Sequence, residues 1–145
     1  MTLDILEDES SAFADEMKAR IAAFNAQHWD ASARKPLGLK LLGADGSLLG
    51  GISGRTFGNW CHIEYLWVSE AGRGQGLGSR LLSRAEELAR ARGCHSVLLD
   101  TLEFQARDFY QRHGYRTVWV QQQYPFSGEK YFMVKQLDMV KQLGQ

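Results

Sequence analysis

The chain has 145 residues, and its 17 basic side chains balance 17 acidic ones, which gives a formal net charge of +0 at pH 7. Its length predicts one domain, residues 1–145, with one hydrophobic core. The balanced charge gives no reason to expect nucleic acid or an anionic membrane surface as a partner. No apolar run approaches the roughly 18 residues of a membrane span, and the acidic N-terminus is unlike a signal peptide, so we expect a cytoplasmic protein.

The first elements expected along the chain are a strand and a helix. Residues 2–6 are predicted to form a short strand that ends in an acidic run. Apolar side chains recur every three or four residues over 11–26, which predicts an amphipathic helix. Either Ser10 or Ser11 is suited to cap its N-terminus.

A hairpin and a third strand follow. The strands over 37–42 and 48–57 flank the turn residues 44–47, Ala-Asp-Gly-Ser, so they are expected to pair in antiparallel fashion. The stretch 62–68 is rich in β-branched and aromatic residues, which predicts a further strand after a second tight turn. The middle of the sheet is therefore expected to be antiparallel.

The second half of the chain predicts two helices and three strands: helix 77–92, strand 96–100, helix 106–113, and strands 115–122 and 130–137. Strand 62–68, helix 77–92 and strand 96–100 together predict a βαβ unit. The whole order is β-α-β-β-β-α-β-α-β-β, which is typical of an α/β protein with a mixed sheet.

Cys61 and Cys94 have no CxxC pattern and no spacing typical of a zinc site. Each adjoins a segment that is expected to be buried. We therefore expect reduced thiols in the core, and no metal.

Four glycines alternate with other residues at positions 72, 74, 76 and 78, directly at the start of the helix over 77–92. Glycine within regular structure costs roughly 0.5–1 kcal/mol relative to alanine, so this density indicates a loop with a specific role. The unpaired amides of a helix N-terminus and the positive end of the helix dipole attract anions, and glycines let a phosphate approach the backbone. The loop therefore predicts a phosphate site.

Three alternative roles for this loop fit the sequence less well. A dinucleotide-binding G-x-G-x-x-G pattern fails, because its third glycine is replaced by Leu77 when counted from Gly72, and by Ser79 when counted from Gly74. A P-loop fails because the chain reads Gly-Ser-Arg over 78–80, where Gly-Lys-Ser/Thr is needed. A purely structural turn needs fewer glycines.

Two motifs resemble a known family. Residues 73–78, Arg-Gly-Gln-Gly-Leu-Gly, match the pattern R/Q-x-x-G-x-G/A, and residues 106–115, ARDFYQRHGY, resemble A-x-x-F-Y-x-x-x-G-F/Y. On these motifs the chain resembles the GNAT acyltransferase superfamily, closely over about residues 62–115 and in its order of elements over about 2–138.

The resemblance implies a GNAT-like fold in which the strand over 62–68 bulges and splays away from its neighbour over 96–100. It implies an acyl coenzyme A donor, usually acetyl, whose pantetheine arm binds the free backbone of the bulged strand and whose pyrophosphate binds the glycine loop. The donor-binding residues implied are Leu66, Trp67, Val68, Arg73, Gly74, Gln75, Gly76, Leu77, Gly78 and Ser79.

The resemblance also implies a catalytic acid, Tyr110, which would protonate the departing thiolate; a phenol with a pKa near 10 suits this task. From helical spacing alone, Tyr110 would be a core tyrosine with its hydroxyl satisfied locally. Glu64 is the expected base, because an unpaired carboxylate in an apolar run is costly and favours a functional or ion-paired role. His62, two residues away on the same predicted strand face, and water are the alternatives.

The expected acceptor is a primary amine of a small molecule or peptide. Superfamily members often carry an asparagine seven residues before the tyrosine, whereas this chain has Glu103, which would face the acceptor or cap the helix. Aromatic side chains would line the acceptor site, or would equally form a homodimer interface or part of the core: Trp29, Trp60, Tyr124 and Phe126.

Two further function classes stay open at this point. One is a non-catalytic domain that binds or senses acyl coenzyme A, although a pure binder has no need of the acid Tyr110. The other is a nucleotide-binding protein of a different fold, which would bind ATP or a dinucleotide better than coenzyme A.

Overall fold

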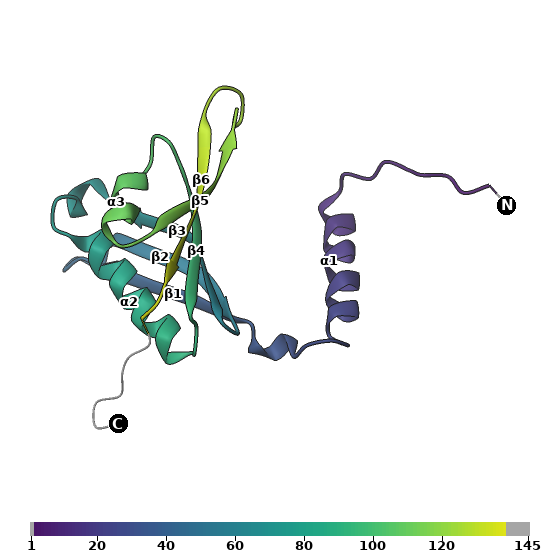
Figure 1. Ribbon diagram of the computed structural model, residues 1–145, viewed down its shortest axis with the longest axis horizontal. Helices are drawn as coiled ribbons and strands as arrows, with labels where there is room; N and C mark the ends of the chain where they lie inside the picture. Colours follow the sequence, from purple (N-terminus) through teal and green to yellow (C-terminus); the bar gives the residue numbers. More distant parts are fainter. Residues whose placement is uncertain (1, 139–145) are drawn as a thin grey trace. The chain divides into compact units, whose positions relative to one another are not determined.

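The computed structural model describes residues 2–138 of the chain (Figure 1). These residues fall into two compact units that divide between Ala33 and Arg34, and each is described by itself. None of the helices in this part of the chain has the length and hydropathy that crossing a lipid bilayer would require.

The first unit contains α1 (Ser11–Asn25) and a short 3₁₀ turn, η1 (Ala31–Ala33). The predicted helix is confirmed, and its N-cap is Ser10, whose hydroxyl accepts a hydrogen bond from the Phe13 N–H at 3.2 Å. The predicted strand over 2–6 is wrong, because residues 2–10 form neither helix nor strand. A strand requires a neighbouring strand, and the six-stranded sheet does not include this segment.

The second unit is built on a mixed sheet with the strand order β1-β2-β3-β4-β6-β5, in which β3 and β4 are parallel and the other neighbours antiparallel. The predicted hairpins and βαβ unit are confirmed. The strands are β1 (Lys35–Leu42), β2 (Leu48–Phe57), β3 (Trp60–Val68), β4 (Ser96–Leu102), β5 (Arg116–Gln122) and β6 (Glu129–Gln136). The helices are η2 (Glu70–Gly72), α2 (Leu77–Ala91) and α3 (Arg107–Arg112).

The core lies between α2 and the sheet. Leu82, Ala85 and Ala89 recur at helical spacing and are fully buried against Val97 of β4 and Met133 of β6. Figure 1 shows α3 on the same side of the sheet as α2. This packing leaves the opposite face of β1, β2 and β3 uncovered by α2 and α3.

Cys61 and Cys94 are both buried in this core as free thiols, as predicted. Burial raises the pKa of the Cys61 thiol to about 12, and it raises the pKa of the Cys94 thiol as well. Both side chains therefore act as small apolar groups, and neither is prepared to act as a nucleophile.

A β-bulge interrupts the pairing of β3 with β2. Ser53 pairs with Tyr65 and Gly54 pairs with Ile63, so Glu64 is left without a partner in β2. Glu64 and Tyr65 are consequently both exposed, although they are adjacent in the strand and would otherwise point to opposite faces.

The bulge brings two backbones close together and is followed by a gap in the sheet. A Cβ at Gly54 would overlap the carbonyl of His62, so only glycine fits at this position. β3 pairs with β4 at three positions alone, where residues 60–62 face residues 96–98. Beyond them the two strands separate, which confirms the splayed sheet.

A buried ionic cluster joins α2 to the last two strands. Glu86 in α2 is 5% exposed, and its carboxylate accepts hydrogen bonds from the Tyr115 hydroxyl and the Lys135 ammonium, each at 2.8 Å. Burial and the negative charge of Glu86 raise the pKa of Tyr115 well above its usual value, so its hydroxyl stays a donor. Both oxygens of the buried carboxylate are thereby satisfied.

We expect Tyr115→Phe to lower the free energy of unfolding by about 1–3 kcal/mol, because it leaves one oxygen of a buried carboxylate without its donor. Urea unfolding followed by circular dichroism measures the change. Tyr65→Phe is the matched control, since Tyr65 is 73% exposed and a surface change of this kind stays within about 0.5 kcal/mol. Equal stabilities of the two variants would contradict this role for Tyr115.

Candidate functional site

The separation of β3 from β4 opens a cleft of about 390 Å³. Its walls come from the C-terminal halves of both strands, from the start of α3 and from the segment that leads into β6. Six of the lining residues bear on its chemistry: Glu64, Leu66, Trp67, Asp100, Tyr110 and Lys130. The structure therefore brings four predicted site residues, Glu64, Leu66, Trp67 and Tyr110, to one cleft.

The backbone of β3 is exposed to this cleft along one edge. β2 occupies the other edge of β3 as far as Val68, whereas β4 pairs with β3 only up to His62. Peptide groups of residues 63–68 that face the cleft thus have no strand partner. Such an edge can hydrogen-bond an extended ligand as if it were another strand.

Tyr110 reaches the cleft from the core. Its side chain is 7% exposed and packs edge-on against Tyr115, with 5.7 Å between the ring centroids. Within residues 2–138, no hydrogen bond satisfies its hydroxyl, and the one fully buried side-chain polar atom without a partner is Thr117 Oγ1. The Tyr110 hydroxyl therefore keeps a small contact with the cleft and is available to a ligand.

The proton of Tyr110 is firmly held. Burial raises its pKa to about 12, and the negative charge of Asp100 acts in the same direction. At neutral pH the residue is a neutral phenol, which is the form that a general acid requires.

Glu64 lies at the bulge and is more exposed than its apolar sequence neighbours suggest. The apolar run around Glu64 suggested a buried carboxylate, but the bulge turns the side chain outward and leaves it 39% exposed. There it forms an ion pair with Arg55 of β2, with 3.0 Å between Oε1 and Nη1. Of the functional and ion-paired roles that the sequence left open, the structure shows the ion pair, and the role of Glu64 as a base stays a prediction.

His62, the alternative base, does not line the cleft. It lies in the last residue pair between β3 and β4, opposite Leu98, before the strands separate. Of the two candidate bases, only Glu64 faces the cleft.

The glycine loop forms the second part of the site. Gly74 and Gly76 have φ angles of +79° and +71°, which glycine adopts without strain, and a Cβ on either would point into open space. Gly76 is the N-cap of α2 and supplies no side-chain cap, and the first helical hydrogen bond runs from Arg80 N–H to Gly76 O at 3.1 Å. The amides of residues 77–79 precede it and are left free for an anion.

Three other residues in and beside the loop contribute by packing, by a hydrogen bond or by charge. A Cβ at Gly72 would lie 3.1 Å from the Leu49 carbonyl oxygen, so close packing explains this glycine. The Ser79 hydroxyl hydrogen-bonds His113 Nε2 at 2.9 Å, which ties the first turn of α2 to the end of α3. Arg73 is exposed beside the loop, where its charge is free to meet a phosphate.

Sequence reasoning missed two residues of the cleft, Asp100 and Lys130. Asp100 ends the run predicted as a buried strand, and ligands bind preferentially at the carboxyl ends of parallel strands. That position was the available signal for Asp100. Lys130 carried none, because its approach to Asp100 depends on the pairing of β6 with β4.

Of the aromatic residues expected around the acceptor, one lines the cleft and others lie away from it. Tyr124 lines the cleft, whereas Trp60 lies at the start of β3, away from it, and Phe126 is 86% exposed at the β5–β6 turn. Glu103 does not cap α3, whose N-terminus has no side-chain cap. Its carboxylate lies against the turn instead, because a Cβ at Gly128 would come within 2.7 Å of Glu103 Oε1. The role of Trp29, in the first unit, stays a prediction.

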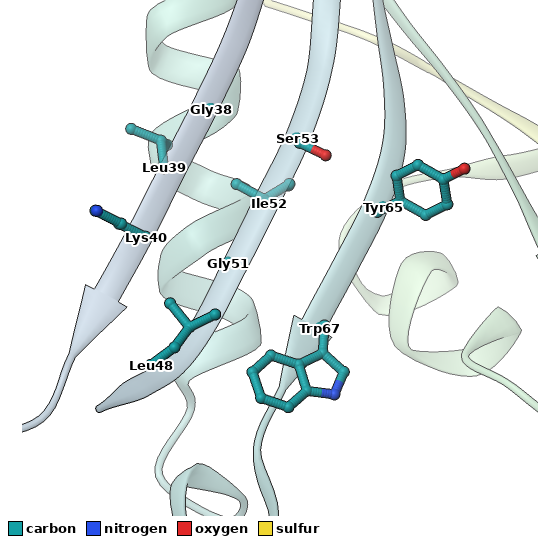
Figure 2. Close-up of a pocket in the computed structure, with 9 residues that line it drawn as sticks. All are labelled: Gly38, Leu39, Lys40, Leu48, Gly51, Ile52, Ser53, Tyr65 and Trp67. Atoms are coloured by element: carbon teal, nitrogen blue, oxygen red, sulfur yellow. The ribbon is translucent and has the colours of Figure 1, made fainter. Parts of the chain in front are cut away.

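A second hollow lies on the sheet face opposite α2 (Figure 2). Gly38 and Gly51 form its floor, since they place no side chain there, and Leu48 lies at one end. Tyr65 and Trp67 line this hollow as well as the cleft, so the two cavities share one wall.

The described residues contain no group of three or more His, Cys, Asp or Glu side chains that could hold a metal ion. The polar groups that line the cleft include a phenol, two carboxylates, the Lys130 ammonium and free backbone groups. These are the groups needed for proton transfer and for binding an extended ligand with phosphates.

Comparison with known proteins bears on the family and the fold. The profile of the Acetyltransferase (GNAT) family matches residues 2–115. Blasticidin-S acetyltransferase from Streptomyces morookaense is 44% identical over 96 residues, which are 66% of this chain and 71% of that protein. A crystal structure of an acetyltransferase from Bacillus cereus superimposes with a TM-score of 0.82 and 30% identity, covering 92% of this chain and 98% of that one.

One solved structure with the same fold holds the acetyl donor. It is an acetyltransferase from Bacillus anthracis in complex with acetyl coenzyme A, with a TM-score of 0.63 and 19% identity over 71% of this chain and 63% of that one. The GNAT acetyltransferases use acetyl coenzyme A as their donor. The chain belongs to the GNAT family of acetyltransferases and is an acyl coenzyme A-dependent N-acyltransferase.

Proposed function

We propose that this enzyme transfers the acetyl group of acetyl coenzyme A to a primary amine of a small molecule or peptide. The observation that carries this proposal is the placement of Tyr110, an unsatisfied phenol, in a cleft that also contains the Glu64 carboxylate and the free edge of β3. One cleft thus contains a proton donor, Tyr110, a proton acceptor, Glu64, and backbone groups of β3 that can bind the donor molecule.

The donor fits the free backbone groups of the site. The amides of residues 77–79 and the positive end of the α2 dipole would hold its pyrophosphate, and Arg73 would add a positive charge. Gly74 and Gly76 leave this surface free of Cβ atoms. The free edge of β3 from Leu66 to Val68 would hold the pantetheine arm, which directs the thioester toward Tyr110.

The cleft residues then divide the proton transfers between them. Glu64, directly or through water, accepts a proton from the ammonium group of the acceptor and frees the nitrogen lone pair. The nitrogen forms its bond to the acetyl carbon while the carbon–sulfur bond breaks, and the sulfur leaves with the electron pair of that bond. Tyr110 donates its proton to this sulfur, and its phenoxide then takes the second proton of the acetylated nitrogen, directly or through water. Free amides of β3 stabilise the negative charge that develops on the carbonyl oxygen.

The similarity to blasticidin-S acetyltransferase supports a small-molecule acceptor, because that name gives the acceptor of a related enzyme. A peptide amine remains within the proposal, since the β5–β6 turn contributes Tyr124 to the cleft wall and offers a surface for a longer acceptor. A panel of acceptors distinguishes the two.

The test is release of free thiol from acetyl coenzyme A in the presence of polyamines, amino acids, aminoglycosides, arylamines or peptide N-termini. We expect turnover with at least one class. Tyr110→Phe, which removes the proton donor and keeps the ring, should lower kcat about 100-fold and leave the Kd of coenzyme A unchanged. Absence of turnover despite tight coenzyme binding would overturn the proposed function, and an unchanged kcat would exclude Tyr110 as the acid.

The glycine loop generates a second prediction. Gly76→Asp should weaken coenzyme A binding about tenfold more than Gly76→Asn, because both side chains tolerate a positive φ while only aspartate repels a phosphate. Isothermal titration of each variant with coenzyme A measures the difference. Equal dissociation constants would show that the phosphates bind elsewhere.

The pH dependence of kcat/KM follows from the raised pKa of Tyr110, about 12. A phenol with a raised pKa keeps its proton at every pH below that value, so loss of this proton should not limit the rate up to roughly pH 10. We therefore expect kcat/KM to show no alkaline fall below about pH 10 that is due to this residue. A fall below pH 10 that disappears in Tyr110→Phe would contradict the assignment.

A further inference from the structure

The acceptor end of the cleft contains an ion pair that the proposed reaction does not use. Asp100 on β4 and Lys130 on β6 lie on adjacent strands, with 3.7 Å between Asp100 Oδ1 and Lys130 Nζ. Their side chains are 38% and 23% exposed, so both remain in contact with solvent and with the cleft. The family profile ends at residue 115, before Lys130.

The ammonium group of Lys130 lies among groups that bind alkylammonium ions. Its nitrogen is 5.0 Å from the ring centroid of Tyr124 and 5.6 Å from that of Phe132, in addition to its approach to Asp100. A carboxylate and two aromatic faces together hold a cation well. In residues 2–138, neither the Asp100 carboxylate nor Lys130 Nζ makes a hydrogen bond within the chain, so displacing the lysine breaks no hydrogen bond.

Glu64, the other carboxylate of the cleft, has a closer ion-pair partner than Asp100 has. Among residues 2–138, Glu64 pairs with the guanidinium of Arg55 at 3.0 Å, whereas Asp100 pairs with the ammonium of Lys130 at 3.7 Å and with no other cation. Asp100 also lies close enough to Tyr110 for its charge to affect that phenol. An incoming cation would therefore pair with Asp100 more readily than with Glu64, because the ion pair that it must replace there is longer. Asp100 also lies beside the proton donor Tyr110.

We propose that Asp100, Tyr124 and Phe132 form the subsite for the ammonium group of the acceptor, and that Lys130 occupies this subsite when no acceptor is bound. The inference rests on the proposed function and narrows its acceptor to alkylamines. An alkylamine is a cation at neutral pH, like the lysine side chain, whose pKa is about 10.4. An arylamine is uncharged at this pH and gains nothing from Asp100.

Two substitutions that should change the affinity for an amine in opposite directions test this subsite. The probe is 2-phenylethylamine, titrated by NMR into the enzyme saturated with coenzyme A, and its uncharged counterpart is 2-phenylethanol. We expect Asp100→Asn to weaken binding of the amine about fivefold or more, because the asparagine keeps the shape and loses the charge. We expect Lys130→Met to tighten it by a similar factor, because the competing cation is gone. Neither variant should change the affinity for the alcohol.

Glu87→Gln is the matched control, since Glu87 is an exposed carboxylate of α2 paired with Arg84 at 3.4 Å, outside the cleft. Unchanged amine affinity in Asp100→Asn, or equal changes for amine and alcohol, would overturn the subsite. Weaker or unchanged amine binding in Lys130→Met would overturn the competition. These binding outcomes are independent of turnover, so a failure of the proposed function would appear separately, as no thiol release by the wild-type enzyme with any amine.

Discussion

The separation of β3 from β4 beyond His62 and Leu98 determines where each functional group of this enzyme can lie. Two parallel strands that stayed paired would satisfy one another's peptide groups and leave no space between them. Here the bulge at Glu64, which Gly54 makes sterically feasible, precedes a stretch in which β3 offers free peptide groups to a ligand. The same gap admits Tyr110 from one side and solvent from the other.

The glycine loop and the cleft are connected through α2 and β6. The helix α2 begins at the glycine loop, and Glu86 in the same helix is tied to Lys135 on β6. β6 also carries Lys130, at the acceptor end. The buried and hydrogen-bonded Glu86 cluster thus links the helix that begins at the glycine loop to the strand that carries Lys130.

Features that depend on local chemistry could be predicted from the sequence, and features that depend on strand register could not. Gly74 and Gly76 signal their positive φ angles by identity and spacing, so the conformation of this loop was predictable. The outward position of Glu64 depends on the unequal count of residues between β2 and β3, which alternation in one strand does not reveal. The approach of Lys130 to Asp100 depends likewise on pairing between distant segments.

Because Cys61 and Cys94 are buried, the native enzyme should not react with thiol-specific reagents. Only a thiolate reacts with disulfide reagents at an appreciable rate, and burial keeps both groups protonated and inaccessible at neutral pH. A colorimetric disulfide reagent in the reaction mixture thus reads released coenzyme with no background from the folded protein. In a heated sample without coenzyme, the rate at which the same reagent reacts measures how fast the core between α2 and the sheet opens.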